Sequence, residues 1–204
     1  MNKVNIYVEG NEKKFIEELI STLVLVNNFP FEVFCTNGKD KIYGKEYPKL
    51  LSKNTDLEIG NILIFDADNQ DTKARKTEIL EKIAVVNNKL ELNIRIDDVF
   101  LLPNDVNSGC FEILLFEVMN QKHRDNIFKC LDKYQDCVKD QKYCPTNDKQ
   151  RDKAKVYAYL EALDYNNEEI FKPNKTNYLS KEIWDLDSKS LQSLKTFLMK
   201  NLNK

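Results

Sequence analysis

Two short apolar runs, each followed at once by carboxylates, constrain this sequence more than any other feature. Residues 4–8 (Val-Asn-Ile-Tyr-Val) precede Glu9, and residues 62–65 (Ile-Leu-Ile-Phe) precede Asp66 and Asp68. Runs of this length that are rich in Val, Ile and Phe are typical of buried strands. In an α/β sheet, ligands bind at the carboxyl ends of the parallel strands. We therefore expect the three carboxylates to meet at one edge of a sheet.

Carboxylates held this close repel one another and raise one another's pKa unless a cation lies among them. A hard cation such as Mg²⁺, or Mn²⁺ in its place, prefers carboxylate oxygens. Glu9, Asp66 and Asp68 are therefore candidate metal ligands. If the chain is extended there, the two aspartates point the same way with Cα atoms ~6.6 Å apart. The alternatives are a surface glutamate at a strand end and a helix-capping turn at Asp66-Ala67-Asp68.

Strand-like and helix-like segments alternate along the first 120 residues. Strands are expected at 4–8, 31–35, 61–65 and 99–102, and helices at 12–27, 47–51, 72–87 and 111–120. This alternation predicts an α/β fold of the Rossmann-like kind, with a mostly parallel four-stranded sheet flanked by helices. In the helix at 72–87, Ile79, Leu80, Ile83 and Val86 are expected to face the core.

Helices dominate the rest of the chain. They are expected at 123–139, at 152–163, and from Asp187 or Ser188 to about Leu202. Ser or Asp is a favoured residue just before a helix begins. We therefore expect residues 1–120 to form the α/β core and residues 121–204 to form a helical C-terminal appendage packed on it.

Composition and charge bound the location and the partners. The sequence has no stretch of 18 apolar residues and begins with what reads as a strand, so neither a membrane span nor a signal peptide is expected. Its five cysteines, an odd number, are expected to be free thiols in a reducing compartment, which indicates the cytoplasm. A net charge of -2 predicts no strong general attraction to nucleic acid.

Positive charge is nevertheless concentrated between residues 39 and 53. This segment carries lysines at positions 39, 41, 45, 49 and 53 against Asp40 and Glu46. It is either a solvated loop or a segment that contacts phosphate groups, and contacts of the second kind depend on salt concentration. The sequence leaves both interpretations open.

A seven-residue spacing links His123, Cys130, Cys137 and Cys144. In a helix, seven residues rise ~10.5 Å. The ligands of one zinc ion must all lie ~2.0–2.3 Å from it. Side chains at this pitch along one helix cannot meet at one ion, so the spacing does not predict a structural zinc site.

The two carboxylate motifs resemble those of the Toprim domain, which has Glu-Gly after its first strand and Asp-x-Asp after a later one. Here these are Glu9-Gly10 and Asp66-Ala67-Asp68. Further segments resemble small stand-alone Toprim proteins on the branch of the overcoming-lysogenization-defect nucleases, many of which are known only as a domain of unknown function. These segments are residues 100–104, 109–112, 152–155 and 183–187, so the resemblance covers nearly the whole chain.

The resemblance implies a Toprim-like sheet that binds Mg²⁺ and acts on phosphodiesters. Glu9 would be a general acid/base or a metal ligand, and Asp66 and Asp68 would be metal ligands. Glu112 would match a further acidic position of the nuclease branch. It is also a carboxylate in the first turn of a helix, which the helix dipole favours for any acid.

A basic residue that stabilises phosphoryl charge would correspond to Lys153 or Lys155, and we take Lys155 as the catalytic candidate. Either lysine could instead be a solvated residue on a helix. Asn11 departs from the family, because Toprim proteins often have an acidic residue directly after Glu-Gly. The chain also lacks the ATPase and DNA-gripping regions of large members, which implies a partner ATPase subunit or an unusual small substrate.

Three functions compete. The first is a Mg²⁺-dependent nuclease or phosphotransferase, with nucleic acid as partner and a role in phage or mobile-element defence. The second is a non-catalytic module that holds metal and a nucleotide or partner protein, which the absence of a strong basic field favours. The third is another Asp-x-Asp metal enzyme. A haloacid-dehalogenase-like phosphatase would have Thr or Val where Gln70 stands, and a glycosyltransferase would not require Glu9.

Overall fold

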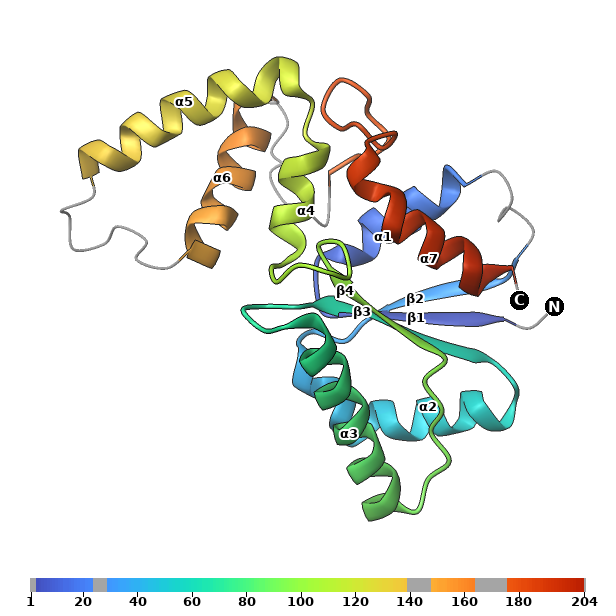
Figure 1. Ribbon diagram of the computed structural model, residues 1–204. Helices are drawn as coiled ribbons and strands as arrows, with labels where there is room; N and C mark the ends of the chain where they lie inside the picture. Colours follow the sequence, from blue (N-terminus) through green and yellow to red (C-terminus); the bar gives the residue numbers. More distant parts are fainter. Residues whose placement is uncertain (1–2, 24–28, 139–147, 164–175, 204) are drawn as a thin grey trace.

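The computed structural model describes residues 3–23, 29–138, 148–163 and 176–203 (Figure 1). Its centre is one sheet of four parallel strands in the order β2-β1-β3-β4. The strands are β1 (Val4–Val8), β2 (Phe31–Cys35), β3 (Gly60–Asp66) and β4 (Asp98–Leu102). The predicted four-stranded parallel sheet is therefore confirmed, with each strand end within one residue of its predicted position.

The strand order reverses at β1. From β1 the chain first adds β2 on one side and then adds β3 on the other, where Val8 pairs with Ile64. A reversal of this kind opens a crevice at the carboxyl ends of the two strands on either side of it, and ligands of open α/β sheets bind there. Glu9 follows β1 and Asp66 ends β3, so both residues lie at this point of the sheet.

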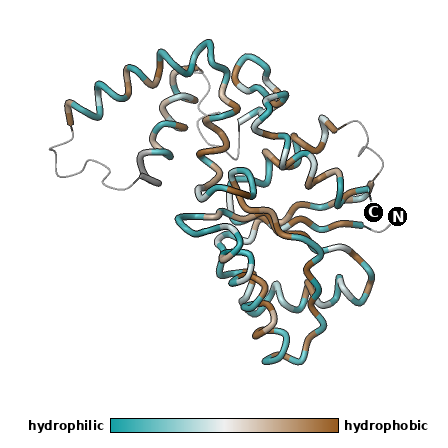
Figure 2. Tube along the Cα trace, viewed as in Figure 1, coloured by the Kyte–Doolittle hydropathy of each residue, from teal (hydrophilic) through white to brown (hydrophobic). Residues whose placement is uncertain are grey.

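Helices cover both faces of the sheet (Figure 1). One face carries α1 (Glu12–Ser21), α4 (Phe111–Val118) and α7 (Gln192–Leu202), and the other carries η1 (Lys39–Tyr43), α2 (Glu46–Asp56) and α3 (Thr72–Leu90). Successive strand residues alternate between the two resulting cores: Ile62 and Ile64 pack with α1, and Leu63 and Phe65 with α3. Burial on both faces explains why the strands are nearly continuous apolar runs (Figure 2).

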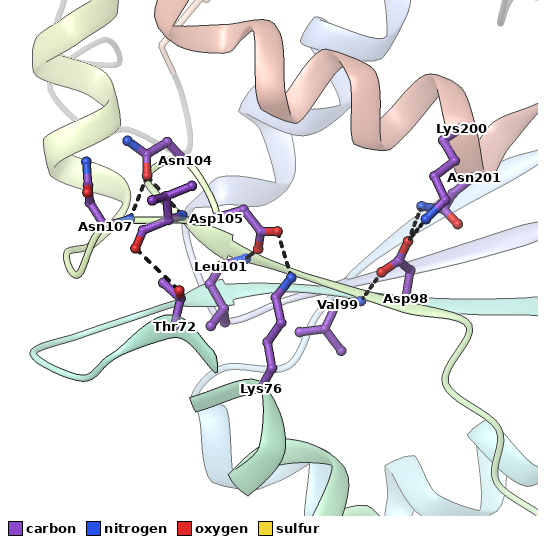
Figure 3. Close-up of polar contacts among 11 residues, drawn as sticks. Thr72, Lys76, Asp98, Val99, Leu101, Asn104, Asp105, Asn107, Lys200 and Asn201 are labelled. Atoms are coloured by element: carbon purple, nitrogen blue, oxygen red, sulfur yellow. Dashed lines mark hydrogen bonds and ion pairs between the residues drawn. The ribbon is translucent and has the colours of Figure 1, made fainter. Parts of the chain in front are cut away.

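The C-terminal helices join this core in two ways. Helix α7 packs on β4, where the ring centroids of Phe197 and Phe100 lie 5.2 Å apart. Lys200 and Asn201 bind the Asp98 carboxylate at 2.8 and 3.2 Å (Figure 3). Helices α5 (Gln121–Val138) and α6 (Asp148–Leu163) pack on each other and extend away from the sheet, which α6 reaches through α4 (Figure 1).

Several helix details differ from the prediction. Helix α2 is longer than the predicted 47–51, and Ser188 caps a short 3-10 turn, η2 (Lys189–Leu191), that leads into α7. The expectation that Leu80 faces the core is wrong, because it is 46% exposed. Ile79 and Ile83 already fill the contact with the sheet, and a residue one position along a helix points ~100° away. Residues 24–28, at the end of the helix predicted at 12–27, lie outside the described ranges.

Within the described ranges, no helix is both long enough and apolar enough to cross a membrane.

Candidate functional site

Glu9 and Asp66 connect three elements at the carboxyl edge of the sheet. The Glu9 Oε1 atom accepts a hydrogen bond of 3.2 Å from the backbone N–H of Asp66. The Asp66 carboxylate, in a residue only 5% exposed, accepts one of 2.9 Å from the backbone N–H of Phe111, the first residue of α4. The structure thus brings together the two carboxylates that the sequence placed at neighbouring strand ends.

Asp68 reaches the same edge by a turn rather than by continuing the strand. Its φ of 54° is left-handed, so the chain is not extended across residues 66–68, which was the condition for the two aspartates to point the same way. The turn arises because Asp68 exchanges two backbone hydrogen bonds with Gly109, of 2.8 and 2.7 Å. Asp is among the few residues with a side chain that adopt this conformation readily. Its carboxylate forms an ion pair of 2.7 Å with Lys39 Nζ.

Polar contacts with β4 and with the start of α3 hold the loop that carries Gly109 (Figure 3). Asp105 accepts hydrogen bonds from the backbone N–H of Leu101 at 2.8 Å and from Lys76 Nζ at 2.6 Å. The Thr72 hydroxyl donates to the carbonyl of Val106 at 3.3 Å. These contacts tie the segment after β4 to the start of α3, and they fix the loop that positions Asp68.

The carboxylates at this edge act on one another electrostatically. Burial, followed by the charges of Asp66, Asp68 and Glu12, raises the pKa of Glu9 to about 7. The repulsion expected from the sequence is therefore present in the fold. A carboxyl group with this pKa can gain or lose a proton near neutral pH.

Glu12, which the sequence analysis did not single out, belongs to the same cluster. It lies in the first turn of α1, is 6% exposed, and accepts a hydrogen bond of 2.6 Å from the backbone N–H of Gly10. Burial, followed by the charge of Asp66, raises its pKa to about 7, and Glu112 adds to the effect. In the sequence Glu12 looks like any first-turn acid; only its spacing of three residues from Glu9 gave a hint.

Glu112 lies at the same edge from the side of α4. Its side chain is 13% exposed, and Lys153 Nζ lies 3.8 Å from its carboxylate. Burial, followed by the charge of Glu112, raises the pKa of the neighbouring Cys110 thiol to about 12. That thiol stays protonated at neutral pH and is a poor nucleophile, since the thiolate is the reactive form.

Lys153, rather than Lys155, is the α6 lysine that reaches the carboxylates. Lys155 Nζ lies 3.7 Å from Asp132 and 5.8 Å from the centre of the Phe128 ring, both in α5. Residues two positions apart on a helix point ~200° apart, so the two lysines face opposite sides. Of the two candidate lysines, Lys153 therefore lies beside the carboxylates, and Lys155 is directed toward α5.

Lys39 is the second cation at the site, and it comes from the lysine-rich segment whose role the sequence left open. It begins η1 and reaches Asp68 across the end of the sheet. With 42% of its side chain exposed, it remains accessible to a substrate. The site therefore combines a group of carboxylates with two ammonium groups, Lys39 at Asp68 and Lys153 at Glu112.

A family model described as a protein of unknown function (DUF3226) matches residues 3–203. The chain belongs to this family. The match runs through the sheet and the helical C-terminal part alike, so both parts are features of the family. No curated protein and no solved structure matches the chain. The resemblance to Toprim remains a hypothesis.

The donor chemistry of this DUF3226 site fits a hard divalent cation, because its central groups are carboxylates. Among the residues that the structure describes, however, no three acidic, histidine or cysteine side chains are already arranged to hold an ion. Their oxygens are engaged by backbone N–H groups and by Lys39. Binding of a cation would thus require side-chain rotation, including exchange of Lys39 for the ion at Asp68.

Proposed function

We propose that this protein is a Toprim-like enzyme that depends on Mg²⁺ or Mn²⁺ and acts on phosphodiesters, as a nuclease or phosphotransferase. The observation that carries the proposal is the gathering of Glu12 and Asp66, both buried, and the half-buried Glu9 at the point where the strand order reverses. Burial, followed by repulsion from the neighbouring carboxylates, raises the pKa of both glutamates to about 7. A divalent cation is the simplest ligand that would relieve this repulsion.

Each residue of the site would have its own role in catalysis. Glu9, Asp66 and Asp68 would hold the cation, with Glu112 close by. A bound divalent ion stabilises the negative charge that develops on a phosphoryl oxygen. Glu12 would take up or release a proton near neutral pH. It also supplies the acid that Toprim proteins often have one position earlier, where this chain has Asn11.

The two ammonium groups support a phosphate-containing substrate. Lys153 Nζ lies 3.8 Å from the carboxylate of Glu112, and Lys39 Nζ lies 2.7 Å from that of Asp68. Fixed positive groups near a reacting phosphoryl group stabilise charge in the transition state. We further infer that the enzyme acts in the cytoplasm on nucleic acid, with an ATPase subunit as partner and phage or mobile-element defence as its setting.

The second candidate function is a non-catalytic module that binds metal and a nucleotide or a partner protein. The net charge of -2 favours it, since the chain has no strong basic field to attract nucleic acid. The non-catalytic module is also favoured because the carboxylate side chains must rotate before they can hold an ion. A phosphatase of another Asp-x-Asp class has less support. In such enzymes the Asp-x-Asp motif usually follows the first strand, whereas here β1 and Glu9 precede the motif.

Two measurements test the proposal together. Crystals soaked in Mn²⁺ should show an anomalous peak between Glu9 and Asp66. The protein should also cleave single- or double-stranded DNA or RNA with Mg²⁺ or Mn²⁺, and Glu9→Gln and Asp66→Asn should abolish cleavage. Glu81→Gln, at an exposed position of α3, is the matched control and should leave cleavage unchanged. A Mn²⁺ peak with persistent inactivity would favour the module; absence of Mn²⁺ binding would reject both.

A further inference from the structure

Two buried donors close to the carboxylate site have no acceptor among the residues that the structure describes. Arg75 is 3% exposed, and its guanidinium donates to Glu78 Oε2 at 2.9 Å. Its Nε–H group and the Tyr43 hydroxyl are both shielded from solvent, and neither has a hydrogen-bond partner in the described part of the chain. Buried polar groups are almost always paired, and one left unpaired costs about 1–3 kcal/mol. Two unpaired groups in one region indicate that an acceptor belongs there.

Tyr43 and Arg75 come from elements that pack on each other. Tyr43 ends η1, which contacts α3. Its ring lies 5.5 Å from Lys82 Nζ, and Lys82 lies two turns after Arg75 on the same side of α3. Between them, Glu78 binds both cations, at 2.9 Å to Arg75 and 2.6 Å to Lys82. Tyr43 therefore lies along the face of α3 that carries Arg75.

Arg75 remains charged in this environment. Burial acts against its charge, but the hydrogen bond and the charge of Glu78 outweigh burial and raise the pKa of the guanidinium. Tyr43 and Glu9 act in the same direction. The influence of Glu9 places Arg75 within electrostatic reach of the carboxylate cluster. A charged guanidinium offers five N–H donors, and one hydrogen bond to Glu78 leaves capacity for an anion.

The same two elements also border the carboxylates directly. Segment η1 begins with Lys39, which binds Asp68, and ends with Tyr43. Helix α3 begins one residue after Asp71, which closes the loop that carries Asp66 and Asp68. The unpaired donors thus flank the proposed cation site on the α3 side of the sheet.

We propose that Arg75, Tyr43 and Lys39 form a subsite for the phosphoryl group of the substrate, a role that rests on the proposed function. All three present donors, which match the non-bridging oxygens of a phosphate and not a cation. Guanidinium is the side-chain group best suited to this geometry. The donors are closed off in the ligand-free protein, so the phosphoryl group enters when η1 shifts from α3. Gly38, with a φ of 121°, and Gly44 bound that segment.

Inorganic phosphate added to the metal-free protein tests the subsite. The probe is the Nε–H resonance of Arg75 in a proton–nitrogen NMR spectrum, assigned by its disappearance in Arg75→Lys. We expect this resonance to shift with phosphate and to saturate. Tyr43→Phe should weaken phosphate binding roughly tenfold, the effect of one lost hydrogen bond to an anion. It removes only an unpaired hydroxyl, so the variant should fold at least as stably as the wild type.

Arg95→Lys is the matched control, because Arg95 is an exposed arginine paired with Asp97, and it should leave phosphate binding unchanged. If saturating phosphate fails to move the Arg75 resonance, or Tyr43→Phe binds phosphate as the wild type does, the subsite is rejected and internal water satisfies the donors. Mn²⁺ binding at Glu9, read in the same spectra by paramagnetic broadening, separates the two claims. Broadening without a phosphate response rejects the subsite alone, and a phosphate response without broadening rejects the metal-dependent function alone.

Discussion

The backbone N–H of Asp66 donates a 3.2 Å hydrogen bond to the carboxylate of Glu9, across 57 positions of sequence. This contact holds the half-buried carboxylate of Glu9 beside the end of β3, which itself terminates in the carboxylate of Asp66. The metal-free fold therefore tolerates a repulsion that removal of one charge should relieve.

Glu9→Gln should leave the metal-free protein as stable as the wild type or more stable at pH 8. Gln keeps the oxygen that accepts from Asp66 and removes the charge whose burial raises the pKa of Glu9 to about 7. We expect a gain of about 1–3 kcal/mol in the free energy of unfolding, measured by urea denaturation in the presence of a chelator. Glu81→Gln is the control for charge removal alone. A clear loss of stability in Glu9→Gln would contradict the clustered-charge interpretation.

The stability of the metal-free protein should fall as pH rises from about 4.5 to about 7. Glu9 and Glu12 have pKa values near 7 in the fold against an ordinary 4.5, so the native state binds more protons than the unfolded state in this interval. Their stabilisation is complete below 4.5 and lost as pH passes 7, on the order of 3 kcal/mol for each group. Hydrogen bonds from Lys82 and Arg75 lower the pKa of Glu78 to about 2, so its effect lies outside this window.

The measurement for this pH dependence is a series of urea denaturation curves between pH 4 and 8 with chelator present. The double variant Glu9→Gln with Glu12→Gln should show a flatter profile than the wild type. An equal slope in the two proteins would mean that neither glutamate titrates as proposed.

Lys153→Met should reduce metal-dependent cleavage by one to two orders of magnitude, whereas Lys155→Met should have little effect. Of these two lysines, Lys153 lies near a carboxylate of the site, 3.8 Å from Glu112, whereas Lys155 faces Asp132. A rate loss of one to two orders of magnitude corresponds to about 1.4–2.8 kcal/mol of transition-state stabilisation, which we expect one fixed positive group near a phosphoryl group to supply. The rates of the two variants under single-turnover conditions decide between the lysines, and a larger loss in Lys155→Met would restore the sequence-based choice.

Gly109→Ala should destabilise the protein more than Gly38→Ala does. Both glycines have a left-handed φ, of 145° and 121°, so both variants carry backbone strain of roughly 1–3 kcal/mol. A Cβ at Gly109 would also lie 2.8 Å from Ile113 Cδ1, whereas one at Gly38 would meet no atom within 4 Å. The difference between the two unfolding free energies isolates this steric clash. Equal losses of unfolding free energy in the two variants would show that the loop shifts to accommodate the Cβ atom. Packing at Gly109 would then not fix the position of Asp68.

The strands, and the positions of Glu9 and Asp66 at the site, could be predicted from the sequence because they depend on local patterns. A buried parallel strand is apolar throughout, and a carboxylate directly after it must lie at the strand's carboxyl end. Glu9 and Asp66 therefore needed no tertiary information. Glu12 did, because its burial and its closeness to Asp66 and Glu112 arise only when the segments that carry these residues pack together.

The position of the lysines at the site could not be predicted from local sequence patterns either. Lys39 and Lys153 reach the carboxylates only through the way η1 and α6 dock, which no local pattern encodes. The sequence predicted the edge at which Asp68 lies but left its conformation open, since its turn depends on pairing with the distant Gly109. Sequence patterns here indicate which residues lie at strand ends, and the packing of later segments decides which groups join them.

Phe197→Ala should lower the stability of the whole molecule by about 3–5 kcal/mol. Phe197 lies in α7, is 8% exposed, and packs on Phe100 of β4, within a core that continues from the sheet to Trp184. Unfolding followed by far-ultraviolet circular dichroism and by the fluorescence of Trp184 should therefore shift together. Ser193→Ala, at an exposed position of the same helix, is the control. If the two signals separate, with the sheet melting as in the wild type, residues 121–204 would have to be treated as an independent folding unit.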